Sequence, residues 1–106
     1  MAKYLFLASY TAHGTKGIMR DGGSSRRDQV DKMIRGLGGK LEAFYFALGD
    51  YDVYGIAELP DHAAATAMSM AINATGAVQV KTVVLMSPEE IDQASKVSVN
   101  YRPPGD

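Results

Sequence analysis

In residues 44–57, FYFALGDYDVYGIA, two apolar runs flank the polar segment GDYD. Glycine and aspartate favour tight reversals, and the flanking runs are rich in the aromatic and β-branched residues that strands prefer. The stretch therefore predicts a strand at about 40–48, a turn at Gly49-Asp50, and a second strand that continues to Leu59. We expect Gly49 to adopt a backbone conformation that side chains resist.

Alternating and helical spacings extend this hairpin into a longer pattern. Ser25 is a candidate helix N-cap because apolar residues follow it at the spacing of one helical face, and Gly38 marks the end of that helix. Proline at the first helical position indicates another helix after Ser87. The expected elements outside the hairpin are a strand at 3–10, a glycine-rich connection with one helical turn around Ile18 and Met19, a helix from Ser25 to Gly38, a helix from Asp61 to Thr75, a strand at 77–86, a short helix from Ser87 to Lys96, and an extended tail.

The order β-α-β-β-α-β predicts a ferredoxin-like α+β fold with one four-stranded antiparallel sheet. Strands one and three should lie in its middle, with both helices on one face. We expect a single domain over residues 1–106, with the βαββαβ core at 1–87 and an extra short C-terminal helix and extended tail at 88–106. Several strands carry apolar residues on both faces, so the face without helices needs a cover, and a second copy of the chain is the simplest one.

The second long helix supports association as well. No charged side chain occurs between Ala63 and Val80. A helix on the surface of a monomer needs a solvated face, although alanine also tolerates water. This run favours a homo-oligomer, a dimer or higher, with Met70 in a contact.

The string LGGKLEAFYFALGDYDVYGIAELPD closely resembles the GYD domain family, small bacterial α+β proteins largely without an assigned activity. The signature falls on Gly49, Tyr51 and Asp52 when Asp50 is taken as its variable position. Similarity extends from YTAHGTKG through GGSSRR and LPDHAAA to SPEEID and YRPPG. The resemblance implies the fold above and a relation to dimeric α/β barrel proteins.

Composition limits the classes of partner and cofactor. The chain has 11 basic and 12 acidic residues and no cysteine. The balance of charges gives no strong positive potential to attract nucleic acid or an anionic membrane. Without cysteine, no thiolate metal site can form. No phosphate loop, dinucleotide fingerprint, zinc-protease motif or serine-hydrolase elbow occurs, so we expect no cofactor and no metal. The short apolar run at 4–8 cannot span a membrane, and we expect a cytoplasmic protein.

Three residues are candidates for catalysis. Asp52 and Tyr51 could form an acid-base pair at a strand end. We prefer a structural interpretation, in which Asp50 and Asp52 bond backbone amides around the turn and Tyr51 anchors the hairpin in the core. His13 follows the first strand, where a loop could present it to a ligand, but we prefer to interpret it as a solvated loop residue, and the resembling family more often carries an acidic residue there.

Basic residues gather where the first long helix begins. Arg26 and Arg27 lie in its first turn, where free backbone amides already attract anions. Their partner could be a phosphate or carboxylate ligand, or an acidic residue of a neighbouring subunit, and we prefer the second.

These observations leave the reaction open, including whether the protein is an enzyme. The leading hypothesis is an oligomeric domain whose sheets enclose a small apolar cavity for an organic ligand, near Tyr4, Phe6, Phe44 and Phe46. One alternative is a cofactor-independent oxygenase or isomerase of the dimeric α/β barrel type. Another is a signalling module that binds an anion at residues 24–27.

Overall fold

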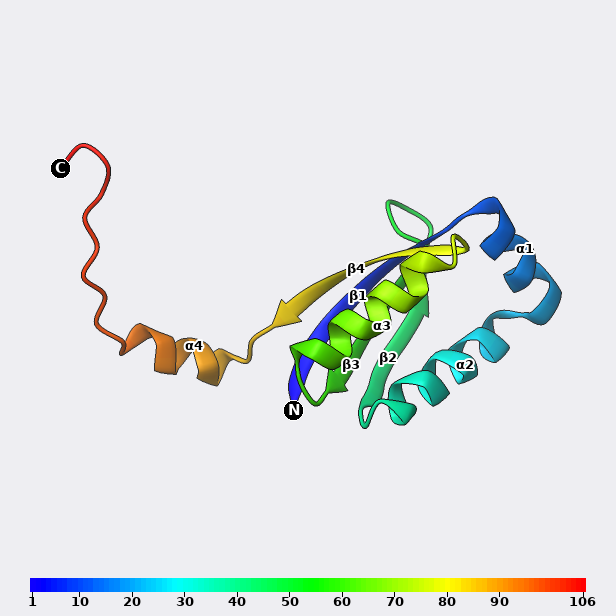
Figure 1. The fold of residues 1–106 in the computed structure, drawn as a ribbon, viewed down its shortest axis with the longest axis horizontal. Coiled ribbons are helices and arrows are strands. Elements are labelled where there is room, and N and C mark those ends of the chain that lie inside the picture. Colours follow the sequence, from blue (N-terminus) through cyan, green and yellow to red (C-terminus); the bar gives the residue numbers. More distant parts are fainter.

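A computed structural model describes residues 1–106 and contains four strands and four helices (Figure 1). The strands are β1 (Ala2–Tyr10), β2 (Lys40–Phe46), β3 (Val53–Leu59) and β4 (Val78–Leu85). The helices are α1 (Ala12–Asp21), α2 (Gly23–Gly36), α3 (His62–Ala74) and α4 (Pro88–Ser95).

The four strands form one antiparallel sheet in the order β2-β3-β1-β4. The ferredoxin-like prediction is confirmed, with β1 and β3 in the middle of the sheet. Leu5 of β1 lies opposite Ile56 of β3 on one side and Val83 of β4 on the other. This register fixes which side chains share a face of the sheet, because successive residues of a strand point to opposite faces.

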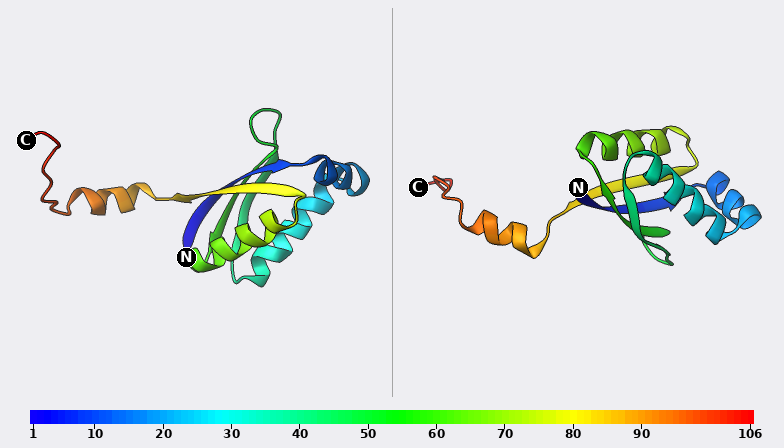
Figure 2. Two further views of the ribbon diagram at one scale, coloured as in Figure 1. Left: turned by 45° about the horizontal axis from the view of Figure 1, so that its top comes forward. Right: turned by 90° about the horizontal axis from the view of Figure 1, so that it is seen from below.

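Helices α2 and α3 lie together on one face of the sheet (Figure 2). The core forms between them and the even-numbered side chains of β1, and Tyr4, Ile34 and Leu59 are its largest fully buried members. Met68 of α3 packs into the same cluster. Helix packing on a sheet face thus buries one side of the central strands β1 and β3, as the apolar alternation predicts, whereas the edge strands β2 and β4 are covered only in part.

The opposite face of the sheet has no helix over it, and it is also apolar. Leu5 and Leu7 of β1 are half-buried there, although Tyr54 and Val83 beside them are 38% and 41% exposed. The chain therefore carries large apolar side chains on both faces of its sheet, as expected. We call this uncovered surface the bare face and define it by Leu5, Leu7, Tyr45, Tyr54, Ile56 and Val83.

The glycine-rich segment after β1 differs from the prediction, because it forms the ten-residue helix α1 rather than a loop with one turn. The side chain of Thr11 caps it by accepting a hydrogen bond from the amide of Gly14, and it also donates to the carbonyl of Ala77. A Cβ at Gly14 would lie 2.1 Å from the Ala77 oxygen, so only glycine permits this close approach. Helix α2 then begins at Gly23, and the prediction that Ser25 caps its start is wrong.

The connection between β2 and β3 is longer than a two-residue turn. It spans residues 47–52, with β2 ending at Phe46, and the amide of Ala47 bonds the carbonyl of Asp52 at 2.8 Å. Glycines with positive φ occur at four other positions, and Gly49 is not among them. The prediction of a strained Gly49 is therefore wrong, because six residues reverse the chain without a left-handed backbone.

The end of the chain projects away from the sheet (Figure 1). Helix α4 begins with a capping box of Ser87 and Glu90, but none of its residues is buried. The molecule measures 58 × 33 × 23 Å as a result. We call residues 86–106 the C-terminal arm. None of the four helices has the length and apolar character needed to cross a membrane.

Candidate functional site

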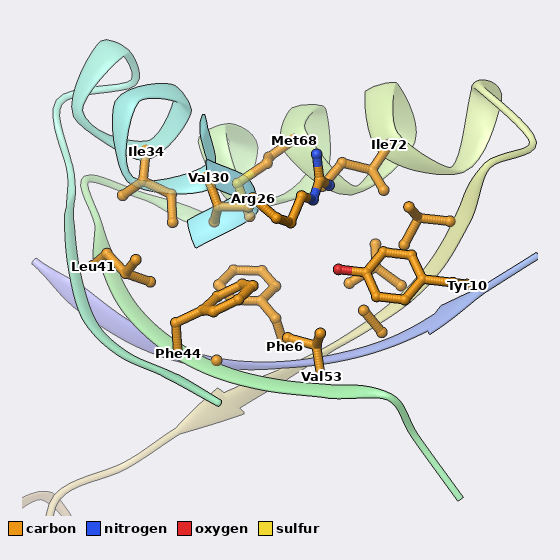
Figure 3. A pocket seen from close by; sticks show the side chains of 14 residues that line it. Phe6, Tyr10, Arg26, Val30, Ile34, Leu41, Phe44, Val53, Met68 and Ile72 are labelled. Carbon is orange, nitrogen blue, oxygen red and sulfur yellow. The ribbon is translucent and has the colours of Figure 1, made fainter. Parts of the chain in front are cut away.

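A small cavity lies between the sheet and the two helices that cover it (Figure 3). Its volume is about 50 Å³, and 12 of its 14 lining residues are hydrophobic. They come from all four strands and from α2 and α3, so the cavity needs the complete sheet and both covering helices. The lining residues are Phe6, Ala8, Tyr10, Arg26, Val30, Ile34, Leu41, Phe44, Val53, Gly55, Met68, Ile72, Val78 and Val80.

Arg26 is the one charged residue of this lining. It lies in the first turn of α2, and Figure 3 shows its side chain reaching across the cavity toward the ring of Tyr10. The Nε atom is buried and has no hydrogen-bond partner. A buried donor left unpaired costs on the order of 1–3 kcal/mol, and more when it is charged. The fold therefore leaves the Nε–H group of this cation unsatisfied next to an apolar space.

Tyr10 lies at the opposite side of the cavity, at the last position of β1. Its phenol oxygen points toward the space below the Arg26 guanidinium (Figure 3). Burial raises the pKa of Tyr10 above its usual value, although the hydrogen-bonding capacity and charge of Arg26 oppose this rise. The phenol is therefore neutral at physiological pH and can donate a hydrogen bond.

A second, more polar hollow lies outside these two residues and shares them with the cavity. It has a volume of about 190 Å³, and His13 and Gln29 contribute side chains to it. Asp21 also lines it, but Arg20 holds that carboxylate with two hydrogen bonds of 3.0 Å. Tyr10 and Arg26 thus stand between an apolar inner space and a solvent-facing outer one. We call this second space the outer hollow.

The model of one protein family matches residues 4–95, and its description is GYD domain. The chain belongs to the GYD domain family. No curated protein and no solved structure matches the chain. Family membership agrees with the resemblance seen in the sequence, and the site of this GYD domain must be interpreted from its own residues.

The four aromatic residues expected at a ligand cavity all lie on the helix-covered side of the sheet. Phe6 and Phe44 line the cavity. Tyr4 lies deeper in the core, where its hydroxyl meets Nδ1 of His62 at 2.5 Å, and Phe46 packs beside Gly23 at the start of α2. The cavity of this GYD domain therefore lies between sheet and helices, and these residues cannot line a space between two sheets.

The candidate catalytic residues do not converge on one point. The Asp52 carboxylate accepts a hydrogen bond of 2.8 Å from the backbone amide of Tyr10. Tyr51 packs edge-on against Tyr54 of the bare face, with the Lys81 ammonium 5.7 Å from its ring centre. Neither side chain lines the cavity or the outer hollow, whereas His13 lines the outer hollow.

The arginines expected to act together have separate environments. Arg27 pairs with the neighbouring Asp28 at 3.3 Å and points to the surface, whereas Arg26 turns inward. Arg20 and Arg35 also have carboxylate partners within the chain, Asp21 and Asp31. Of the four arginines in α1 and α2, only Arg26 lacks one.

Tyr10 and Gln29 were not recognised as site residues from the sequence. The alternation of β1 places Tyr10 on the same face as Tyr4 and Phe6, and its position at the strand end was the available signal. Gln29 lies three residues after Arg26 on the same side of α2, a spacing that brings helical side chains together.

No group of three or more histidine, aspartate or glutamate side chains could hold a metal ion.

Proposed function

We propose that this GYD domain binds a small, largely apolar organic molecule in the cavity between its sheet and helices α2 and α3. The observation that carries this proposal is the lining, in which 12 of 14 residues are hydrophobic and the one charged side chain, Arg26, has a buried Nε atom without a hydrogen-bond partner. Ligand sites are typically concave and apolar, with a few polar groups that fix orientation. The cavity and its mouth have this composition.

The two alternatives have less support in the geometry. A cofactor-independent oxygenase or isomerase would need acid and base groups facing its substrate, but Asp52 bonds a backbone amide and Tyr51 lies against the bare face. An anion sensor using both arginines of the first turn of α2 would need them to act together, but Arg27 is already paired with Asp28. Binding in the cavity needs neither arrangement.

Neutral apolar probes test the proposal directly. Xenon and n-butanol should shift the NMR signals of the Val30 and Ile72 methyl groups, because apolar cavities of proteins take up such probes. Val30→Phe should abolish the shift of the Ile72 methyl signals by filling the cavity. Ala94→Phe adds an aromatic ring on the exposed helix α4 and should leave the shifts intact. If neither probe shifts these signals in the folded wild-type protein, the cavity is closed and the proposal is wrong.

We also propose that a second copy of the chain covers the bare face. Leu5, Leu7 and Ile56 form its centre, and Tyr54 and Val83 extend it toward the edges of the sheet. An apolar surface of this kind, bordered by Lys81 opposite Leu7, is typical of a contact between proteins. The uncharged helix α3 offers a further surface, on which Met70 is 66% exposed. The oligomeric state in solution, measured by light scattering, tests this proposal.

A further inference from the structure

Arg26 lines both the cavity and the outer hollow, and it is the arginine of α1 and α2 without a carboxylate partner. Its Nε atom is buried with no acceptor. A partly buried guanidinium favours an anionic partner, and none of the other residues that line the cavity is acidic. The lining therefore supplies no carboxylate for Arg26.

We propose that Arg26 and Tyr10 bind the carboxylate of a short-chain aliphatic acid whose hydrocarbon tail fills the cavity. This inference rests on the proposed function and names its ligand class. The guanidinium presents its N–H groups in a planar fork that matches the two oxygens of a carboxylate. The Tyr10 phenol lies on the same boundary and donates a third hydrogen bond. A monoanion neutralises the single positive charge of the lining.

The outer hollow favours the entry of an anion. His13 and Gln29 supply polar groups that can exchange hydrogen bonds with it at the surface. The one carboxylate there, Asp21, already accepts both of its hydrogen bonds from Arg20, so its charge is largely compensated. A ligand carboxylate can therefore approach Arg26 without meeting a free like charge.

The volume of the cavity limits the size of the hydrocarbon tail that a ligand can place in it. An engineered apolar cavity that binds benzene has a volume of about 150 Å³. The cavity here measures about 50 Å³, which suits a chain of a few carbons and excludes an aromatic ring. Phe6 and Phe44 would contact such a chain from the sheet, and Val30 and Ile72 from the helices.

Calorimetric or NMR titration with a series of acids tests the ligand class. Acetate, propionate, butyrate and hexanoate are compared at constant ionic strength, balanced with chloride. We expect the affinity to rise about fourfold with each added methylene, until the tail exceeds the cavity. Butyramide and inorganic phosphate should bind at least tenfold more weakly than butyrate, because the first lacks the charge and the second lacks the tail. If butyramide or inorganic phosphate bound as tightly as butyrate, the inference would be wrong.

Two adjacent arginines provide a matched pair of variants. Arg26→Met keeps an apolar stem but removes the cation, so it should lower the affinity for butyrate at least tenfold and lower the affinity for n-butanol by a much smaller factor. Arg27→Met removes the neighbouring surface charge and should leave both unchanged. Equal butyrate affinities for the two variants would contradict the inference.

Further variants keep the test decisive if Arg26→Met folds poorly. Arg26→Lys retains the charge without the planar fork, and Tyr10→Phe removes only the hydroxyl, so each should weaken butyrate binding several-fold. Unchanged affinity in both would overturn the roles of these residues. If wild-type protein binds n-butanol and xenon but not butyrate, the acid is the wrong ligand class and the proposed function stands. If it binds none of the three, both fail.

Discussion

The carboxylate of Asp52 and the backbone amide of Tyr10 are joined by a hydrogen bond of 2.8 Å, which ties the β2–β3 connection to the end of β1. A second bond of the same length runs from the amide of Asp52 to the carbonyl of Ala8. Both contacts fall where β1 turns toward α1. Asp52 therefore holds the residue whose side chain stands at the mouth of the cavity.

Removal of this carboxylate should destabilise the fold. We expect Asp52→Ala to lower the free energy of unfolding by about 1–3 kcal/mol, because it leaves the Tyr10 amide without its charged acceptor. Asp52→Asn should cost less, since an amide oxygen can still accept the bond. Urea unfolding measures both. Asp50→Ala, at an exposed position of the same connection, is the control. Equal unfolding free energies for Asp52→Ala and Asp50→Ala would refute the bracing role.

Two glycines of α1 should respond in opposite directions to the same substitution. A Cβ at Gly14 would meet the carbonyl of Ala77, whereas a Cβ at Gly17 would have no atom within 4 Å. We expect Gly14→Ala to destabilise the protein by about 1–3 kcal/mol through a forced backbone shift. Gly17→Ala should stabilise it by up to about 1 kcal/mol, because alanine favours helices. Thermal unfolding of both variants is the measurement, and a stabilised Gly14→Ala would contradict the close approach of α1 to β4.

The fold was predictable because its signals are local and agree with one another. Alternation in β1 and the apolar spacing of Val30, Met33, Ile34 and Leu37 predict faces that the structure indeed buries or half-buries. Helix α1 was missed because its glycines suggest a loop, and its N-cap residue Thr11 is held in place by a distant contact with Ala77. Local propensity could not reveal that tertiary contact.

The site was only partly predictable for a similar reason. Arg26 and Arg27 are adjacent in sequence and identical in chemistry, but neighbouring helical positions point about 100° apart. Only the placement of α2 against β1 and β2 decides which of them faces the cavity. Asp52 was expected to bond amides around its own turn, and its partner lies instead in β1. The sequence showed these residue types, but their partners depend on packing.

The phenol of Tyr10 should lose its proton at a higher pH than the phenol of an exposed tyrosine. Burial raises its pKa above 10.0, so the folded state holds the phenol proton more tightly than the unfolded state does. The resulting stabilisation is complete below the unfolded pKa and is lost as pH rises through the folded pKa. Tyr10→Phe should therefore lose less stability than wild type in alkaline solution above pH 10.0. Denaturant unfolding over that range tests this, and identical pH profiles would contradict it.

Lysine substitutions distinguish the two surfaces proposed for association. Leu7→Lys places an ammonium in the bare face, and Met70→Lys places one on the exposed side of α3. A buried, unpaired charge destabilises a contact by several kcal/mol, so the variant at the true interface should dissociate to a monomer. Static light scattering at micromolar concentration measures this. If wild-type protein is itself a monomer under these conditions, the proposal of a second copy is wrong.

The C-terminal arm also determines how a single copy of the protein behaves hydrodynamically. A compact chain of this length has a radius of gyration of about 13 Å, whereas the extended shape of this chain gives 17.1 Å. A lone copy should therefore elute early in gel filtration and resemble a heavier particle. Small-angle scattering provides the distinction, because an extended monomer combines the larger radius with the forward intensity of one chain, whereas a dimer doubles that intensity at equal mass concentration.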